Sequence, residues 1–170
     1  MTRGSGETNA ASLRPAGALP RLWAGLIDFF VLFMQYNVVV FLFSLAGLAL
    51  SWLGRVLSLG RPAYLVALAV YRAGWVWSAL VALAYFPYWW ARGGQTFGMR
   101  MLRLRVVTAN EPGGRVGWVR AVGRGLAALL SLGALALGFA WIVIDERHQG
   151  WHDKLAGTLV VHIHDTNGDR

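Results

Sequence analysis

Cysteine is absent from this sequence, and lysine and acidic residues are scarce. Without cysteine the chain has no disulfide bonds, no thiol nucleophile and no cysteine-ligated metal. Charged residues make up 14% of the chain, against about 25% in an average globular protein. The sequence also has no serine-nucleophile motif, no paired catalytic carboxylates and no phosphate-binding loop. We therefore expect neither an enzyme nor a cofactor.

Apolar side chains are abundant instead. They reach 56% of the 170 residues, with nine tryptophans and eight phenylalanines, and the mean hydropathy is +0.48. A small soluble domain leaves a large fraction of its surface in water, so a soluble monomer of this size has no place for so much apolar surface. The composition predicts an α-helical integral membrane protein that contacts the lipid bilayer.

Three apolar runs predict about three membrane segments, at residues 22–53, 73–90 and 126–144. As one helix the first run would be about 48 Å long, more than the hydrocarbon core of about 30 Å, so it must tilt or protrude. The second run begins after Arg72, whose side chain can snorkel to the interface. The third run either spans the bilayer or is re-entrant and turns near Gly133 to Gly138.

The remaining segments are polar. Residues 1–20 are rich in small residues and proline, which predicts a disordered tail before a membrane domain at 21–163, and a second tail follows at 164–170. Arginines crowd the predicted loop 91–125, and the positive-inside rule places this loop and the N-terminus in the cytoplasm of a multi-pass plasma membrane protein. The net charge of +8 thus sets orientation, and we expect no nucleic-acid partner.

Two short stretches alternate between apolar and other side chains, at Leu102–Val107 and Leu159–Ile163. A period of two predicts strands, and an open strand edge cannot lie in lipid. Pairing these strands would put both in a small cytoplasmic β element. Three full spans would leave the C-terminus outside, whereas a re-entrant third segment removes that conflict.

Asp28 lies inside the first apolar run. A carboxylate there costs several kcal/mol unless it is paired, neutral or facing water, so it is a candidate functional residue. Arg21, Asp28 and Gln35 are seven residues apart and share one helix face. The alternative is an ion pair that fixes helix packing. Three arginines are candidate partners: Arg72, Arg120 and Arg124.

Two further segments carry polar groups. In the segment Gly93–Arg100, glycines beside Gln95 and Thr96 allow close approach to a ligand or to backbone, and Thr96 is suited to cap a helix. The alternative is a tight loop at the membrane exit. Near the C-terminus His152, Asp153 and a lysine stand together, but histidines at 148 and 152 without a third spaced ligand predict no metal site.

Together these motifs resemble the RDD family of small bacterial membrane proteins. The resemblance covers about residues 20–163, with Phe97 and Met99 standing where the family usually has proline and a basic residue. It implies a transport role, and sodium/proton exchange has been attributed to some members. The matching residues are Arg21 and Asp28, then Gly94, Gln95, Thr96 and Gly98, and finally His152, Asp153, Leu155, Ala156, Gly157 and Thr158.

Two functions stay open. In the first, the protein is an ion or small-solute transport component in which Asp28 binds a monovalent cation or proton, Arg21 tunes it, and Asp153 acts at the cytoplasmic mouth. Three segments are few for a pathway, so this reading expects a homo-oligomer or a partner membrane protein. In the second, the protein is a non-enzymatic scaffold or accessory protein whose buried charges are structural. Supporting residues in either case are Gln35, Gln95, Thr96, Arg120, Arg124 and His152.

Overall fold

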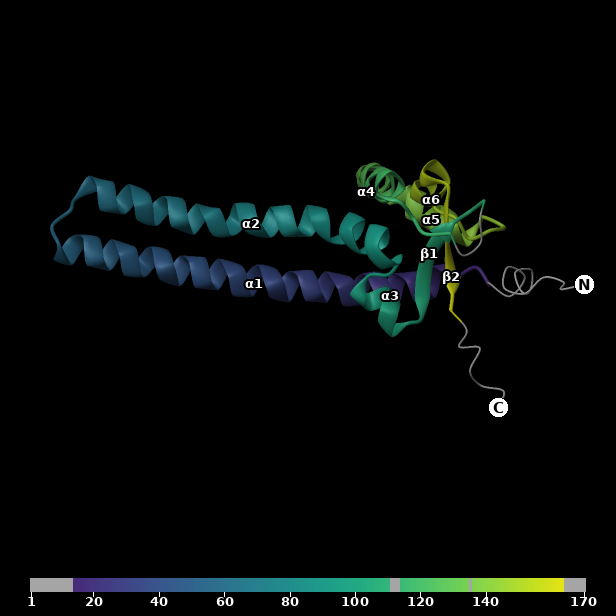
Figure 1. Ribbon diagram of the computed structural model, residues 1–170, viewed down its shortest axis with the longest axis horizontal. Helices are drawn as coiled ribbons and strands as arrows, with labels where there is room; N and C mark the ends of the chain where they lie inside the picture. Colours follow the sequence, from purple (N-terminus) through teal and green to yellow (C-terminus); the bar gives the residue numbers. More distant parts are fainter. Residues whose placement is uncertain (1–13, 111–113, 135, 164–170) are drawn as a thin grey trace, which may run out of the picture. The chain divides into compact units, whose positions relative to one another are not determined.

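The structure is a computed structural model that describes residues 14–110, 114–134 and 136–163. It is mainly helical, with two short strands (Figure 1), which confirms the expected membrane-helical class. The chain forms two compact units, which we call the hairpin unit, Phe29–Tyr85, and the terminal unit, made of the chain up to Asp28 and from Phe86 onward. Residues 1–13 of the predicted tail 1–20, and all of the predicted tail 164–170, lie outside the described residues.

Two helices, α1 (Ala18–Val56) and α2 (Arg61–Gly93), supply the hairpin unit. They lie side by side in antiparallel directions (Figure 1), and small residues bring them close. A Cβ added to Gly54 would lie 2.3 Å from the Cβ of Ala63, and one added to Gly74 would lie 2.7 Å from the Cβ of Phe43. The outward side chains are almost all apolar and exposed. Both helices are long and apolar enough to cross a membrane.

The second helix is longer than the run at 73–90 predicted. It begins at Arg61 and continues unbroken through Arg72, which is exposed. An outward-pointing arginine leaves the backbone hydrogen bonds intact and has good helix propensity, so it does not end a helix. At 1.5 Å per residue, α1 and α2 are about 58 and 50 Å long, well beyond the hydrocarbon core of about 30 Å.

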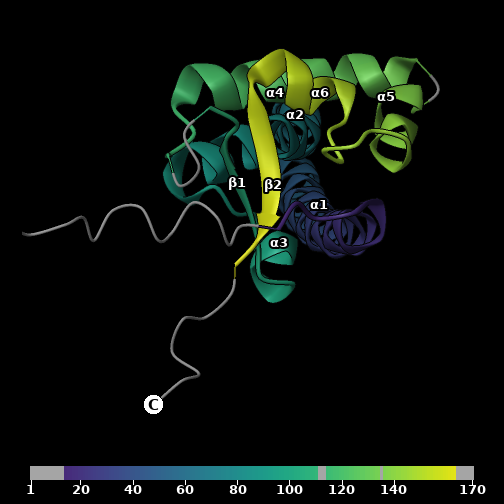
Figure 2. The same ribbon diagram turned by 90° about the vertical axis from the view of Figure 1, so that its right-hand side faces the viewer.

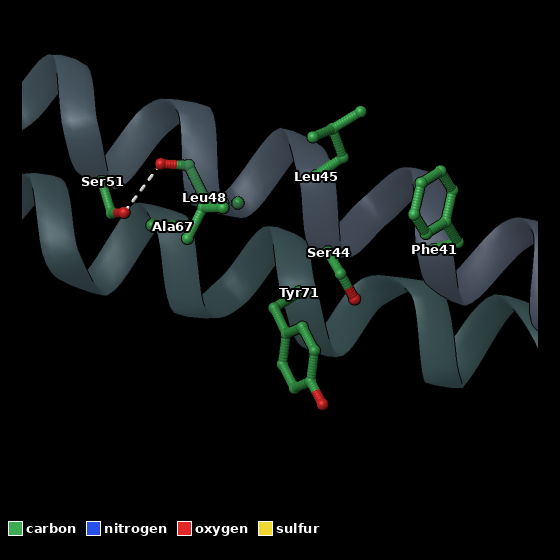
Figure 3. Close-up of a pocket in the computed structure, with 8 residues that line it drawn as sticks. Phe41, Ser44, Leu45, Leu48, Ser51, Ala67 and Tyr71 are labelled. Atoms are coloured by element: carbon green, nitrogen blue, oxygen red, sulfur yellow. Dashed lines mark hydrogen bonds between the residues drawn. The ribbon is translucent and has the colours of Figure 1, made fainter.

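A groove of about 450 Å³ runs along the hairpin unit (Figure 3). Its two serines turn their hydroxyls to their own helix, since Ser44 Oγ donates to Val40 O at 2.6 Å and Ser51 Oγ donates to Leu48 O at 2.8 Å. The groove surface is therefore apolar. It is lined by Phe41, Ser44, Leu45, Gly47, Leu48, Ser51, Ala67 and Tyr71.

The terminal unit is organised around two antiparallel strands, β1 (Leu104–Thr108) and β2 (Thr158–His162), as the alternating patterns predicted. Val106 lies opposite Val160 in this pair. Figure 2 looks onto the two strands. Pro15 forms a bridge with Val161 on β2. The start, the middle and the end of the described chain thus meet in one place.

The last residues of the predicted tail 1–20 are ordered in the structure. Ala16 is fully buried and its N–H donates to Val160 O at 2.9 Å, and α1 begins at Ala18. The expected disorder through Pro20 is therefore wrong from Pro15 onward, because pairing with β2 supplies backbone partners that composition alone does not reveal.

The predicted loop 91–125 is largely ordered secondary structure. It contains the end of α2, the short helix α3 (Phe97–Met101), β1 and the start of α4 (Trp118–Gly133). The third apolar run is split, since α4 is followed by α5 (Leu137–Ala140) and the 3-10 helix η1 (Trp141–Val143) after a bend of 109°. The bend falls where the re-entrant alternative placed its turn.

The helix α6 (Trp151–Ala156) packs against α4 and α5 and leads into β2. Close packing at α5 requires a glycine, because a Cβ on Gly138 would lie 2.3 Å from Ser131 Oγ. The N-terminal segment, α1, α2, α3, β1, α4 and β2 contribute to one apolar core. Its buried members are Ala16, Ala24, Trp90, Met99, Leu104, Val106, Val116, Ala121 and Val160.

Candidate functional site

Asp153 is the centre of a buried cluster of charged side chains in the terminal unit. It is fully buried in the first turn of α6, and its Oδ2 accepts the Gly150 N–H at 3.1 Å. A carboxylate at this position satisfies a backbone donor that the helix cannot satisfy itself. The local sequence therefore fixes where the negative charge lies before any distant residue reaches it.

Two arginines from distant parts of the chain pair with this carboxylate. Arg21 on α1 donates from Nη1 to Asp153 Oδ2 at 2.6 Å, and Arg124 on α4 has Nη2 at 2.8 Å from Oδ1. Each carboxylate oxygen thus faces its own guanidinium. We call Arg21, Arg124, His152 and Asp153 the arginine–aspartate cluster, and it fastens α1, α4 and α6 together.

Further contacts orient the two guanidinium groups. Arg21 Nε donates to Ala16 O at 3.0 Å, which ties the cluster to the segment paired with β2. Arg124 Nη1 donates to Thr158 Oγ1 at 3.1 Å, and its Cζ lies 4.6 Å from the centre of the Trp90 ring. A cation over an indole face is stabilised by the negative face of the ring.

The cluster keeps Asp153 charged and His152 neutral. Burial acts to raise the pKa of Asp153, but the positive charges around it, Arg124 first, outweigh burial and lower that pKa. Burial lowers the pKa of His152 from 6.5 to about 4. Its ring lies 4.6 Å from that of Phe139, and its Nε2 lies 3.7 Å from Asp153 Oδ2. At neutral pH, therefore, the arginines alone balance the aspartate.

Asp28 lies in a second polar contact, which we call the Asp28 clasp. The residue is 2% exposed, and its Oδ2 accepts the Thr96 hydroxyl at 2.5 Å while Oδ1 accepts the Gly98 N–H at 2.8 Å. Thr96 is also the N-cap of α3, since its Oγ1 accepts the Met99 N–H at 3.3 Å, as its position predicted. The clasp joins α1 to the turn that follows α2.

Two glycines in that turn make the approach possible. A Cβ on Gly98 would lie 2.1 Å from Ala24 O, so only glycine fits against α1 there. Gly94 has φ +71°, and a Cβ on it would lie 2.6 Å from Val106 O. Gly94 and β1 are also joined directly, because the Val106 N–H donates to Gly94 O at 2.7 Å. The close approach predicted for this segment is therefore to backbone of the same chain.

The predicted residues separate into these two sites and their surroundings. Arg124, one of the arginines expected to pair with Asp28, pairs with Asp153 instead. Gln95 anchors β1 by donating to Leu104 O at 2.8 Å. Gln35 lies half-buried in the hairpin unit. Arg120 is exposed, one turn nearer the start of α4 than Arg124.

Three further residues take part that sequence reasoning did not assign to the site. Trp90 lies under Arg124. Thr158 accepts from Arg124 through its hydroxyl, and its backbone O accepts from Gln149 Nε2 at 2.8 Å. Thr158 carried a signal, because it closes the C-terminal motif; Gln149 carried none.

The two histidines of this region point to different partners. His148 Nδ1 lies 3.2 Å from Ile142 O, whereas His152 contacts Phe139 and Asp153. In the part of the chain that the structure describes, no group of three or more histidine, aspartate or glutamate side chains could hold a metal ion. The contacts of the arginine–aspartate cluster and of the Asp28 clasp join helices and turns of the terminal unit to one another.

Comparison with known proteins gives a family assignment. A family model described as the RDD family matches residues 15–157, a range that includes the arginine–aspartate cluster and the Asp28 clasp. A search of curated proteins finds no match, and a search of solved structures finds none either.

Proposed function

Since the chain belongs to the RDD family and is a membrane protein with long apolar helices, we propose that it is a non-enzymatic membrane scaffold or accessory protein. Its buried arginines and aspartates hold the terminal unit together. The observation that carries this proposal is that all four carboxylate oxygens of Asp28 and Asp153 contact groups of the same chain. A cation would have to displace those partners in order to bind.

Energetics favour the same reading. A charge taken out of water costs several kcal/mol, and removing one partner of a buried ion pair typically destabilises a protein by about 3 to 5 kcal/mol. The need to compensate buried charge thus explains why Arg21, Arg124 and Asp153 occur together. The arginine excess between 91 and 125 favours a plasma membrane protein with this segment and the N-terminus in the cytoplasm.

A second candidate is ion or small-solute transport, with Asp28 as the residue that binds a proton or monovalent cation. The observation that favours it is the burial of Asp28 on a helix long enough to cross a bilayer, because ionisable residues in such segments often mark ion pathways. In this reading Arg21 and Asp153 set the charge at one end, and a homo-oligomer or a partner membrane protein completes the path.

Asp28→Asn separates the two candidates. For a scaffold, the variant loses charge-assisted hydrogen bonds to Thr96 and Gly98, and we expect a loss of about 1.5 to 3 kcal/mol in unfolding free energy. The measurement is unfolding of the purified protein in detergent, together with its abundance in membranes. Glu146→Gln is the matched control, because Glu146 is an exposed acid of the same unit.

Sodium/proton exchange in reconstituted vesicles provides the other readout. A scaffold gives no exchange above empty vesicles, in the native protein and in both variants. Exchange by the native protein that disappears in Asp28→Asn, with an equal amount of folded protein in the vesicles, would contradict the scaffold proposal and support transport.

A further inference from the structure

The helix α4 is amphipathic in the inverse sense of a soluble helix. Its buried face consists of small residues and one arginine: Ala121, Arg124, Ala127 and Ser131. Its outer face is apolar, with Val119 87%, Leu126 59% and Leu130 72% exposed. In water this arrangement would be unfavourable, because it removes the charged group from solvent and leaves the leucines in it.

The neighbouring elements extend this apolar face. In Figure 2, α4, α6 and α5 lie side by side along one side of the terminal unit, and they contact one another. Val143 is 70%, Ile144 75% and Leu155 74% exposed. Large contiguous apolar surfaces mark contacts with membranes or with other proteins. Two exposed tryptophans, Trp141 of η1 and Trp151 of α6, have ring centres 6.4 Å apart, and tryptophan is enriched in the aromatic belts of membrane interfaces.

The strand pairing limits how this surface can meet a membrane. Because β1 pairs with β2, the chain between them leaves and returns to the same side of any bilayer. The 16 residues of α4 are about 24 Å long, and the seven residues of α5 and η1 reach about 10 Å. Neither helical stretch is long enough to cross a core of about 30 Å.

We propose that α4, α5, η1 and α6 lie in the interface of a lipid leaflet rich in anionic phospholipid, on the side that holds the N-terminal segment, and do not cross the bilayer. Their apolar face contacts acyl chains. The headgroups are faced by three exposed arginines on the same part of the chain, Arg115, Arg120 and Arg147. Among the described residues of this part, the exposed acid is Glu146. The proposal holds whether the protein is a scaffold or a transporter.

The absence of cysteine permits a direct test with single spin labels in the full chain. Labels are placed at Val122, Leu126, Leu130 and Val143, and the protein is reconstituted into phosphatidylcholine–phosphatidylglycerol vesicles. Power saturation with oxygen and with a water-soluble nickel chelate then gives the depth of each label. We expect all four at similar shallow depths in one leaflet, and a control label at the exposed Phe41 of α1 to lie deeper.

Three results would overturn the proposal. A depth that passes the bilayer centre between Val122 and Val143 would make this segment a span. Labels reached freely by the nickel chelate would place the face in water. Labels shielded from both reagents would mean that a protein, including a second copy of the chain, covers it.

Lipid charge is tested separately. The two tests are vesicles of phosphatidylcholine alone and the substitutions Arg115→Gln and Arg120→Gln. Each arginine near an anionic headgroup contributes about 1 kcal/mol to binding. We therefore expect the ratio of inserted to released helix to fall about fivefold for each arginine that no longer meets such a headgroup. Equal insertion in both lipids would overturn the preference for anionic headgroups. Arg72→Gln, a change at an exposed arginine of the hairpin unit, serves as the control.

Discussion

His152 and Asp153 are neighbours in the sequence and in space, but burial affects them differently. Asp153 faces two guanidinium groups and keeps its charge, whereas His152 faces the ring of Phe139 on one side. A protonated His152 would add a third positive charge beside Arg21 and Arg124. The neutral imidazole therefore belongs to the folded state, and folding discriminates against its protonated form.

The free energy of unfolding should consequently fall as the pH becomes acidic. Because the pKa of His152 is lowered to about 4 in the folded state against about 6.5 in the unfolded chain, the unfolded chain binds more protons between these values. Stability is complete above pH 6.5 and is lost as the pH falls toward 4. We expect a loss of about 2 to 3 kcal/mol across this window, measured by unfolding in detergent at a series of pH values.

The variant His152→Gln identifies the source of this dependence. It should be less stable than the native protein at pH 7 but should lose much less stability on acidification to pH 4. His162→Gln, a change at a half-buried histidine of β2, serves as the control and should keep the native dependence. An unchanged pH profile in His152→Gln would show that another group carries the effect.

Among the elements, the junction between α2 and β1 depends on one backbone position. Gly94, the first residue after α2, has a positive φ, and its carbonyl accepts the Val106 N–H. Gly93 precedes it, and a Cβ added there would meet nothing within 4 Å. Two adjacent glycines thus differ in whether a side chain can be accommodated.

We expect Gly94→Ala to destabilise the terminal unit by at least about 2 kcal/mol, because it adds left-handed strain to a clash 2.6 Å from Val106 O. Gly93→Ala should be neutral or slightly stabilising, since alanine has the higher helix propensity. Thermal unfolding of the two variants in detergent is the comparison. Equal melting temperatures would contradict the assigned role of Gly94.

The elements that the sequence predicted are those with a long apolar run or a regular alternation of apolar side chains. The apolar runs that became α1 and α2 have too much apolar surface to face water, and the alternation around Val106 and Val160 requires a strand pair. Arg21 and Asp28, whose heptad spacing gives them one helix face, both have largely buried side chains in the structure. Local pattern and local structure agree in these cases because each depends on neighbours in the chain.

The partners of the polar residues were not predictable in the same way. Arg120 and Arg124 are one turn apart, and which of them is buried depends on what packs over α4. The backbone N–H of Gly98 is a donor that every sequence contains, so nothing marked it as a partner of Asp28. The contacts Asp28–Gly98 and Arg21–Asp153 join residues that are 70 and 132 positions apart, and tertiary packing decides them.

At the scale of the whole molecule, the convergence of Pro15, β1 and β2 fixes which parts of the chain share one side of the membrane. Cysteine variants of the naturally cysteine-free chain test this. Asn110→Cys follows β1, and Leu59→Cys lies in the exposed connection between α1 and α2. In intact cells we expect an impermeant maleimide to label Leu59→Cys and to label Asn110→Cys only after permeabilisation.

The cysteine-free parent chain controls for background labelling. A third variant, Arg14→Cys, should behave as Asn110→Cys does, because the Arg14 backbone O accepts the His162 N–H beside β2. Labelling of the variants at residues 59 and 110 from the same side would contradict two crossings by the helix pair.

The late position of β2 in the chain has a consequence for biogenesis. Val160 and Val161 complete the core around Ala16 and β1, but they are synthesised almost 150 residues after the segment that they cover. The helix pair leaves the ribosome first and can enter the membrane while Arg21 still lacks its aspartate. Closure of the terminal unit is then a post-insertion step, and a chain that ends before Asp153 would remain embedded but unfinished, exposing apolar surface and unpaired arginines to cellular proteases.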